Sequence, residues 1–213
     1  ENLKLNYYEK QAIMGGLLGD LHCRKTATSK NARLEGGHGL KQEQYAWYKM
    51  FLLKRLKFKA RVSDINILYQ SRTFPCLNKY YNMFYGSSKK TITYEILDSL
   101  GPFGLFIWYM DDGHYQKKGK NVKLHTNGFS FTEQELIQTW FEKRLNIFPR
   151  IQNTKDNKNY PGKVWHYLSF PLTETHKLFS LFKGFAIPEC MDYKFPSFIF
   201  TKSPVSGALF AHN

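Results

Sequence analysis

The stretch LFIWYMDDGHY, residues 105–115, decides the fold, because an apolar run ends there on two adjacent carboxylates, Asp111 and Asp112. The run predicts a buried helix, and Gly113 predicts its C-terminal stop. The C-terminal end of a helix carries partial negative charge, so acids are disfavoured at this position. We therefore expect the two side chains either to face water or to meet a positive group.

A second apolar run that closes on an acid lies early in the chain, in IMGGLLGDLH, residues 13–22. Its acid, Asp20, precedes Asp112 by 92 residues. A histidine follows each acid two residues later, as His22 and His114. The matched pattern indicates that the chain repeats itself.

The segments after the two acids also correspond. GLKQEQYAWYKMFLLKRL (39–56) aligns without a gap with GFSFTEQELIQTWFEKRL (128–145). Each segment predicts a strand end followed by an amphipathic helix, and in the second segment Thr132 and Glu135 form a capping-box pattern. We assign four apolar residues of the first helix to the core, namely Trp47, Tyr48, Phe51 and Leu52.

The order of elements then continues alike in both parts of the chain. Strand-like runs come next, followed by a helix-like stretch and finally by a lysine. The corresponding segments are 60–71, 76–86 and Lys90 in the first part, and 149–170, 174–185 and Lys194 in the second. We therefore predict an N-terminal half at residues 1–100 and a C-terminal half at residues 104–213, related by an approximate two-fold axis.

The charge of the chain indicates the kind of partner. Its 213 residues include 31 Lys and Arg against 17 Asp and Glu, which gives a formal net charge of +14. Such an excess favours a polyanion, either nucleic acid or an anionic membrane surface. A membrane binder usually concentrates its charge on one amphipathic helix, whereas the basic residues here recur along the whole chain. We expect an extended nucleic-acid surface and no membrane partner.

A two-fold protein suits duplex DNA, whose antiparallel strands are themselves related by a two-fold. The two acids would then face two phosphodiesters, one on each strand. Carboxylates crowded at helix ends attract cations, and Mg²⁺ takes carboxylates, phosphate oxygens and waters as ligands. Such a metal activates water and stabilises a leaving oxygen, while a lysine from each half offsets the charge of the transition state.

The two acid-ending runs resemble the paired LAGLIDADG motifs of single-chain homing endonucleases, over roughly residues 7–200. They are most similar to the branch that includes the mitochondrial omega-intron endonuclease, whose second motif is also W-x-M-D-D-G. The resemblance implies an α/β (α+β) fold of two pseudo-symmetric αββαββα halves. The motif helices are expected to pair at the centre, and the antiparallel sheets to form a saddle over DNA.

The resemblance also implies the site residues. Asp20 and Asp112 match the metal-binding acids of the family, and Lys90 and Lys194 match its active-site lysines. We expect Gly19 and Asp111 to add to the metal site, with Asp111 acting through its carbonyl oxygen or through a bond to another ligand. The expected cofactor is Mg²⁺, with Mn²⁺ as a substitute and Ca²⁺ supporting binding without cleavage.

Two departures from the family pattern bear on the helix pairing. Leu21 stands where the first motif usually ends in glycine. In the second motif, Ile107 and Trp108 stand at the positions of the two glycines of the first, Gly15 and Gly16. Small residues facing large ones can still pack two helices closely, so we expect a complementary and asymmetric interface.

Further residues are candidates for contacts with the substrate. His22 and His114 should emerge near the scissile phosphates, as hydrogen-bond donors or proton carriers, with a groove contact of no chemical part as the alternative. His38, His125 and Asn127 are candidates near the same site. Predicted strands and hairpin loops carry candidate DNA contacts at Arg24, Lys25, Arg33, Arg61, Arg72, Lys117, Lys120, Lys123, Lys163 and His166.

These features predict a site-specific DNA endonuclease that makes a metal-dependent double-strand break at a long site, acting as a monomer that imitates a dimer. One alternative is a group I intron maturase on the same fold, with intron RNA as its partner. Another is a DNA-binding module whose acids are idle. An intracellular location is expected, because three cysteines without metal-ligand spacing fit a reducing compartment. The wealth of Lys, Asn, Tyr, Phe and Ile favours a mitochondrion or other organelle, with the bacterial cytoplasm as the alternative.

Overall fold

The computed structural model describes the chain apart from residues 1–2, 87–88, 157–162 and 200–213. Its elements follow the predicted order of helix, two strands, helix, two strands and helix, twice over. The first series is α1 (Tyr7–Leu18), β1 (His22–Arg24), β2 (Arg33–Gly39), α2 (Glu43–Leu52), β3 (Lys59–Val62), β4 (Asn66–Gln70) and α3 (Asn78–Tyr85), followed by a short α4 (Tyr94–Asp98). The second series is α5 (Pro102–Asp112), β5 (Gly113–Gln116), β6 (Asn121–Leu124), α6 (Phe131–Leu145), β7 (Arg150–Asp156), β8 (Lys163–Phe170) and α7 (Leu172–Ser180).

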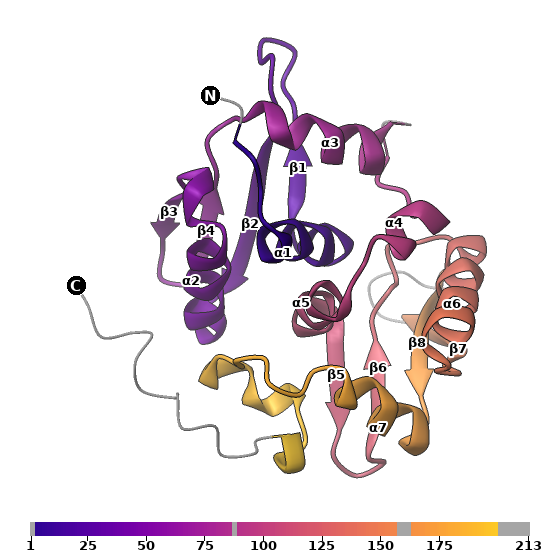
Figure 1. The fold of residues 1–213 in the computed structure, drawn as a ribbon. Helices are drawn as coiled ribbons and strands as arrows, with labels where there is room; N and C mark the ends of the chain where they lie inside the picture. The colour runs from indigo at the N-terminus through magenta and orange to yellow at the C-terminus, as the bar shows by residue number, and fades with distance from the viewer. Residues whose placement is uncertain (1–2, 87–88, 157–162, 200–213) are drawn as a thin grey trace.

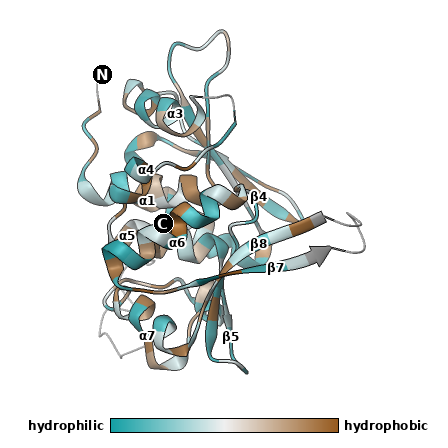
Figure 2. Ribbon diagram, turned by 90° about the vertical axis from the view of Figure 1, so that its right-hand side faces the viewer, coloured by the Kyte–Doolittle hydropathy of each residue, from teal (hydrophilic) through white to brown (hydrophobic). Residues whose placement is uncertain are grey.

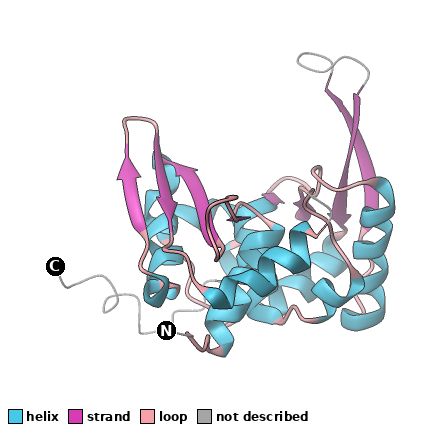
Figure 3. Ribbon diagram, turned by 90° about the horizontal axis from the view of Figure 1, so that it is seen from above, coloured by secondary structure: helices cyan, strands magenta, loops and turns pink. Residues whose placement is uncertain are grey.

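Each series builds one four-stranded antiparallel sheet, and the two sheets have the same topology. The strand orders are β1-β2-β4-β3 and β5-β6-β8-β7. Both sheets stand on the same side of the helices, one toward each end of the molecule (Figures 2 and 3). The structure therefore confirms the predicted α+β fold with two matching antiparallel sheets.

Five short 3-10 turns lie between the described helices and strands and after α7. They lie at η1 (Leu40–Gln42), η2 (Lys54–Leu56), η3 (Pro75–Leu77), η4 (Glu189–Lys194) and η5 (Ser197–Ile199). None of the described helices is long and apolar enough to cross a membrane.

The two helices that end on acids, α1 and α5, lie side by side between the sheets (Figure 1). Gly15 allows this close approach, because a Cβ built there would lie 2.0 Å from the carbonyl oxygen of Gly104 and 3.0 Å from the Cβ of Ile107. The expected packing of small against large therefore holds at Gly15. At Gly16 the space is filled instead by the side chain of Leu21, the residue that replaces the usual glycine.

The start of α6 differs from the prediction. The helix begins at Phe131, so its N-cap is Ser130 and the capping box pairs Ser130 with Glu133, not Thr132 with Glu135. The Ser130 side chain accepts the Glu133 N–H, and the Glu133 carboxylate accepts the Ser130 N–H. Both pairs have the same spacing, so spacing alone does not distinguish them. The preceding segment is also no strand end, because β6 already stops at Leu124.

The buried face of α2 also differs from the prediction. Trp47 and Phe51, assigned to the core, are 45% and 50% exposed, and Tyr48 and Leu52 are only partly buried. The residues that α2 buries are Tyr45, Ala46, Lys49 and Met50. The helix is turned so that Lys49 lies inside, where its ammonium contacts the carboxylate of Asp111.

Candidate active site

The acids Asp20 and Asp112 lie at the C-terminal ends of the paired helices. α1 stops at Leu18 and is capped by Gly19, so Asp20 follows directly, whereas Asp112 is the last residue of α5. The Asp20 side chain is 43% exposed. Asp112 is partly buried and accepts a hydrogen bond from Trp108 Nε1, one turn earlier in its own helix, at 3.1 Å.

Gly113 ends α5 as predicted, but for a different reason. Its φ is −76°, so the backbone does not need the left-handed region that favours glycine. A Cβ at this position would instead lie 2.3 Å from the Tyr109 ring. Close packing of the chain against its own helix requires the glycine here.

The two carboxylates are held in an unfavourable setting. Burial, and after it the charges of Asp111 and Asp20, raises the pKa of Asp112 to about 8. Burial and the charge of Asp111 also raise the pKa of Asp20. Carboxylates in this condition are stabilised by an added cation.

Two lysines reach the backbone carbonyls that precede the acids. Lys90 Nζ donates to Gly19 O at 3.0 Å, and Lys194 Nζ donates to Asp111 O at 2.7 Å. Lys194, carried by η4, also donates to the carbonyl of Met110. Burial is the main cause that lowers the pKa of each lysine. The structure thus brings both predicted lysines to the predicted acids, in the same relation in each half.

The side chain of Asp111 takes no part in this symmetry. Its carboxylate is fully buried and contacts Lys49 Nζ at 2.8 and 2.9 Å, one contact through each oxygen. Tyr45 Oη donates to the same group at 2.7 Å, and the backbone N–H of Asp20 donates to it at 3.0 Å. Burial alone would raise the pKa of Asp111, but Lys49 outweighs it and lowers that pKa.

His38 lies behind Asp20 and is almost fully buried. Its Nδ1 is 3.8 Å from Asp20 Oδ2 and 3.3 Å from Gln42 Oε1, and its Nε2 is 3.4 Å from Lys49 Nζ. Burial and the Lys49 charge lower the pKa of His38 to about 4, so its imidazole is neutral at neutral pH.

Two groupings of these residues could hold a metal. Asp20, His38 and Asp111 place possible ligand atoms within 4.8 Å of one another, but Lys49, Tyr45 and a backbone N–H already occupy the Asp111 carboxylate. The other set contains only oxygens, namely the carboxylates of Asp20 and Asp112 and the carbonyls of Gly19 and Asp111. Hard oxygen donors suit Mg²⁺, so this second set fits the expected ion better.

Three other histidines, His22, His114 and His125, are candidates for the same site. His22 in β1 and His114 in β5 are both exposed. His22 Nδ1 lies 3.0 Å from Tyr85 Oη, and the His114 ring centroid lies 6.3 Å from that of His125. The amide oxygen of Asn127 is buried, with no hydrogen-bond partner among the described residues. That these side chains take part in the reaction stays a prediction.

The strand registers sort the candidate DNA contacts by face. Side chains alternate along a strand, and paired residues share a face. The open face of the first sheet therefore carries His22, Arg24, Arg33 and Arg61, and that of the second carries His114 and Lys123. Lys163 lies in β8, while Lys25 and Arg72 lie in loops beside β1 and β4.

His166 is the candidate that lies apart. It falls on the opposite face from Lys123, and its ring packs against Phe131 of α6, with centroids 5.0 Å apart. This face is covered by the helix, so His166 does not belong to the open surface that carries the other candidates.

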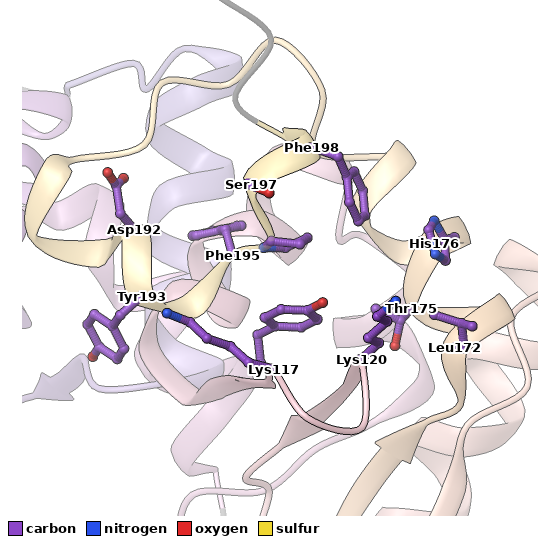
Figure 4. A pocket seen from close by; sticks show the side chains of 12 residues that line it. Lys117, Lys120, Leu172, Thr175, His176, Asp192, Tyr193, Phe195, Ser197 and Phe198 are labelled. Carbon is purple, nitrogen blue, oxygen red and sulfur yellow. The ribbon is translucent and has the colours of Figure 1, made fainter.

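A cavity of about 780 Å³ opens at the outer end of the second half (Figure 4). The β5–β6 hairpin contributes Lys117 and Lys120, α7 contributes His176, and the chain after Lys194 contributes Phe195 and Phe198. Asp192 also lines it, but Asp20, Asp112, Lys90 and Lys194 do not. The cavity is therefore separate from the acids and lysines at the helix ends.

The chain resembles a known family and several known proteins. The model of the LAGLIDADG DNA endonuclease family matches residues 10–178. A probable intron-encoded DNA endonuclease 3 of Mycosarcoma maydis is 30% identical over 118 residues, which cover 55% of this chain and 80% of that protein. The cytochrome b mRNA maturase bI2 of Debaryomyces hansenii is 26% identical over 207 residues, which cover 89% of this chain and 74% of the maturase.

Protein RecA of Mycolicibacterium flavescens is 34% identical over 130 residues, 60% of this chain. The chain spans only 31% of the length of that RecA. Among solved structures, the homing endonuclease I-WcaI bound to its DNA recognition sequence matches with a TM-score of 0.76 and 21% identity, covering 90% of this chain and 87% of its own. I-DmoI in complex with DNA and Mn matches with a TM-score of 0.54 and 16% identity, covering 85% and 100%. At such identities the likeness shows the fold alone.

Proposed function

This chain belongs to the LAGLIDADG DNA endonuclease family, and from that membership we propose that it is a site-specific DNA endonuclease that cuts both strands of a long duplex site with divalent metal. The observation that carries the proposal is the doubled arrangement at the helix ends. Each half offers one acid and one lysine, and each lysine donates to the carbonyl before an acid, Lys90 to Gly19 and Lys194 to Asp111. A matched pair of such arrangements suits two phosphodiesters on antiparallel strands.

The residues divide the work as follows. Asp20 and Asp112, with the carbonyl oxygens of Gly19 and Asp111, would hold the metal. When bound, Mg²⁺ would supply an activated water and stabilise the leaving oxygen. Lys90 and Lys194 bring positive charge to the same place, where negative charge develops in the transition state.

The open faces of the two sheets would bind the DNA. Arginines and lysines on strands contact phosphates and base edges, and the two sheets stand on one side of the molecule. Because the two halves differ in sequence, each sheet would recognise a different half of the site. We propose a monomer as the active species, since one chain already supplies both acids.

A selection from randomised DNA tests the proposal directly. Duplexes that the protein cuts in Mg²⁺ are recovered and sequenced, with Asp20→Asn protein as the matched control. The proposal expects one long consensus site, cut on both strands by the wild type and uncut by the control. Recovery of no consensus, or of the same cut ends with the control, would contradict it. Parallel reactions in Mn²⁺ and Ca²⁺ test the expected substitution and the expected binding without cleavage.

A second function is favoured by one comparison. The similarity to the mRNA maturase bI2 covers 89% of this chain, so the match extends over both halves. This second function would have the chain bind intron RNA in place of DNA or in addition to it. Splicing of candidate introns with Asp20→Asn protein separates the two functions, because a maturase needs no cleaving acid. The organellar location expected from composition stays a prediction, which imaging of the tagged protein tests.

A further inference from the structure

Lys49 is a buried cation that belongs to one half of the molecule and reaches the other. Its side chain is 2% exposed, and its ammonium contacts both oxygens of Asp111, a residue 62 positions later in the chain. Tyr45 lies one turn earlier on the same face of α2 and donates to the same carboxylate at 2.7 Å. Helix α2 of the first half thus holds a side chain of α5, the central helix of the second.

The second half has no counterpart to this contact. The gapless alignment of residues 39–56 with 128–145 places Gln138 at the position of Lys49, and the 92-residue offset of the acids places Gly19 at that of Asp111. Gln138 donates to the carbonyl of Pro149 and not to an acid. The chain therefore departs from its internal symmetry at both partners of one ion pair.

The ion pair leads to only one of the two acids. The Asp111 carboxylate accepts the backbone N–H of Asp20 at 3.0 Å, so the segment that carries Asp20 is tied through Asp111 to Lys49. Asp112 is held differently, by Trp108 Nε1 from its own helix. A carboxylate has about four lone-pair sites, and the donors from Lys49, Tyr45 and Asp20 occupy them. The Asp111 carboxylate therefore links Lys49 to the backbone of Asp20, and it is not free to bind metal.

We propose that Lys49 is a positioning residue that acts through Asp111 on Asp20 and not on Asp112, and so makes the two strand-cleaving centres unequal. This inference rests on the endonuclease function proposed above. Without the ammonium, the Asp111 carboxylate would stay buried beside two other acids and would move or take a proton. Asp20 would lose a contact that positions its backbone, whereas the Trp108 contact of Asp112 would remain.

Strand-specific cleavage tests the inequality. A duplex of the selected site, labelled on each strand in a different colour, is cut in single-turnover reactions by wild type and by Lys49→Gln. We expect the ratio of the two strand rates to change by about 10-fold, since even a 1 Å misplacement of a catalytic group can cost about 10²-fold. Lys54→Gln, at an exposed lysine two residues beyond the end of α2, is the matched control and should leave the ratio unchanged.

The outcomes are distinguishable. Equal slowing of both strands by Lys49→Gln, or no slowing, would overturn the inference while leaving the endonuclease intact. A wild type that cuts neither strand of any selected site would instead remove the proposed function. In that case thermal unfolding still tests whether Lys49 and Asp111 form a coupled pair, because it needs no substrate.

The unfolding experiment compares Lys49→Gln, Asp111→Asn and the double variant with the wild type. Loss of one partner leaves a buried charge unpaired, so each single variant should lower Tm by roughly 6–20 °C. The double variant, with two neutral amides in place of the pair, should lose clearly less than the sum of the two. Additive losses would contradict a coupled pair. If a single variant fails to fold, recovery of a folded double variant gives the same answer.

Discussion

Lys194 donates a hydrogen bond from its ammonium to the backbone carbonyl of Asp111, 2.7 Å away, and so binds the residue that precedes an acid and not the acid itself. Lys90 repeats this relation with Gly19, which precedes Asp20. Each lysine is thus anchored at a helix end, where carbonyl oxygens lack partners within the helix. Anchoring of this kind positions the charge next to the carboxylate while leaving the carboxylate free for a metal.

Lys90→Met and Lys194→Met should therefore each slow cleavage without removing the metal site. The expected loss is that of one electrostatic stabiliser, about 10²-fold or somewhat less, and unequal between the two because the halves differ. Single-turnover rates at saturating protein measure the effect. Unchanged rates in both variants would reduce the two lysines to structural residues.

Asp20→Asn and Asp112→Asn should abolish double-strand cleavage and leave DNA binding nearly intact. Each change removes a ligand charge but no contact of the sheets with phosphate. Gel shifts in Ca²⁺ measure binding, and nicking assays in Mg²⁺ measure cleavage. Wild-type cutting of both strands by either variant would show that the reaction takes place elsewhere.

The part of this site that could be predicted from the sequence is the part that repeats. Asp20 and Asp112 close apolar runs at equivalent places, and a lysine ends each half, so the pattern and the family resemblance both indicate them. The close approach at Gly15 was also predictable, because small residues in a buried helix indicate a neighbouring backbone.

Lys49 could not be predicted in the same way. A lysine among aromatic residues indicates a solvent-facing position, which assigns Trp47 and Phe51 to the core in its place. The partner that makes its burial possible is the carboxylate of Asp111, which lies 62 residues away in sequence, so no pattern within α2 points to it. The face on which His166 lies could not be predicted for a similar reason, because it depends on the register of β8 with β6 and β7.

Salt should weaken DNA binding strongly. If the open faces of both sheets cover a long duplex, on the order of 6–10 phosphate contacts would cost about 10³–10⁵ in affinity between 50 and 200 mM salt. Fluorescence anisotropy in Ca²⁺ over a series of salt concentrations measures the slope. A nearly flat plot of log affinity against log salt would rule out this mode of binding.

The stability of the metal-free protein should fall as the pH rises through neutrality. The pKa of Asp112 is raised to about 8 by burial and by the neighbouring acids, against about 3.9 in an unfolded chain. The folded protein therefore binds the extra proton, and the stability that this proton confers is fully present below pH 4 and is lost as the pH rises through about 8. The lowered pKa of His38 makes the folded protein less stable only below about pH 6.5, where the unfolded chain takes up the proton that the folded chain does not.

Between pH 6.5 and 8 the loss due to Asp112 should reach about 2 kcal/mol, or roughly 4–8 °C in Tm. Thermal unfolding in EDTA at the two pH values measures it. Asp112→Asn, which has no proton to lose, should show a clearly smaller change over the same interval. Added Mg²⁺ should also reduce the change in the wild type, because metal takes the place of the proton. Equal slopes for wild type and variant would contradict the assignment.

His22 and His114 set the last prediction, since both are exposed beside the acids and could contact DNA or carry protons. His22 Nδ1 lies 3.0 Å from Tyr85 Oη, and burial lowers the pKa of His22, so its imidazole is neutral near pH 7 and has one nitrogen left for a partner. His114 pairs with Lys123 across β5 and β6, so both side chains lie on the open face that would contact DNA.

We therefore expect His→Gln at both positions to weaken DNA binding and leave the pH–rate profile unaltered. Tyr85→Phe is the control, because it frees His22 Nδ1 without removing the ring. Loss of a rate dependence near pH 6–7 with unchanged affinity would instead show that the histidines pass protons in the reaction, since the pH–rate profile reports the pKa values of the essential acid and base.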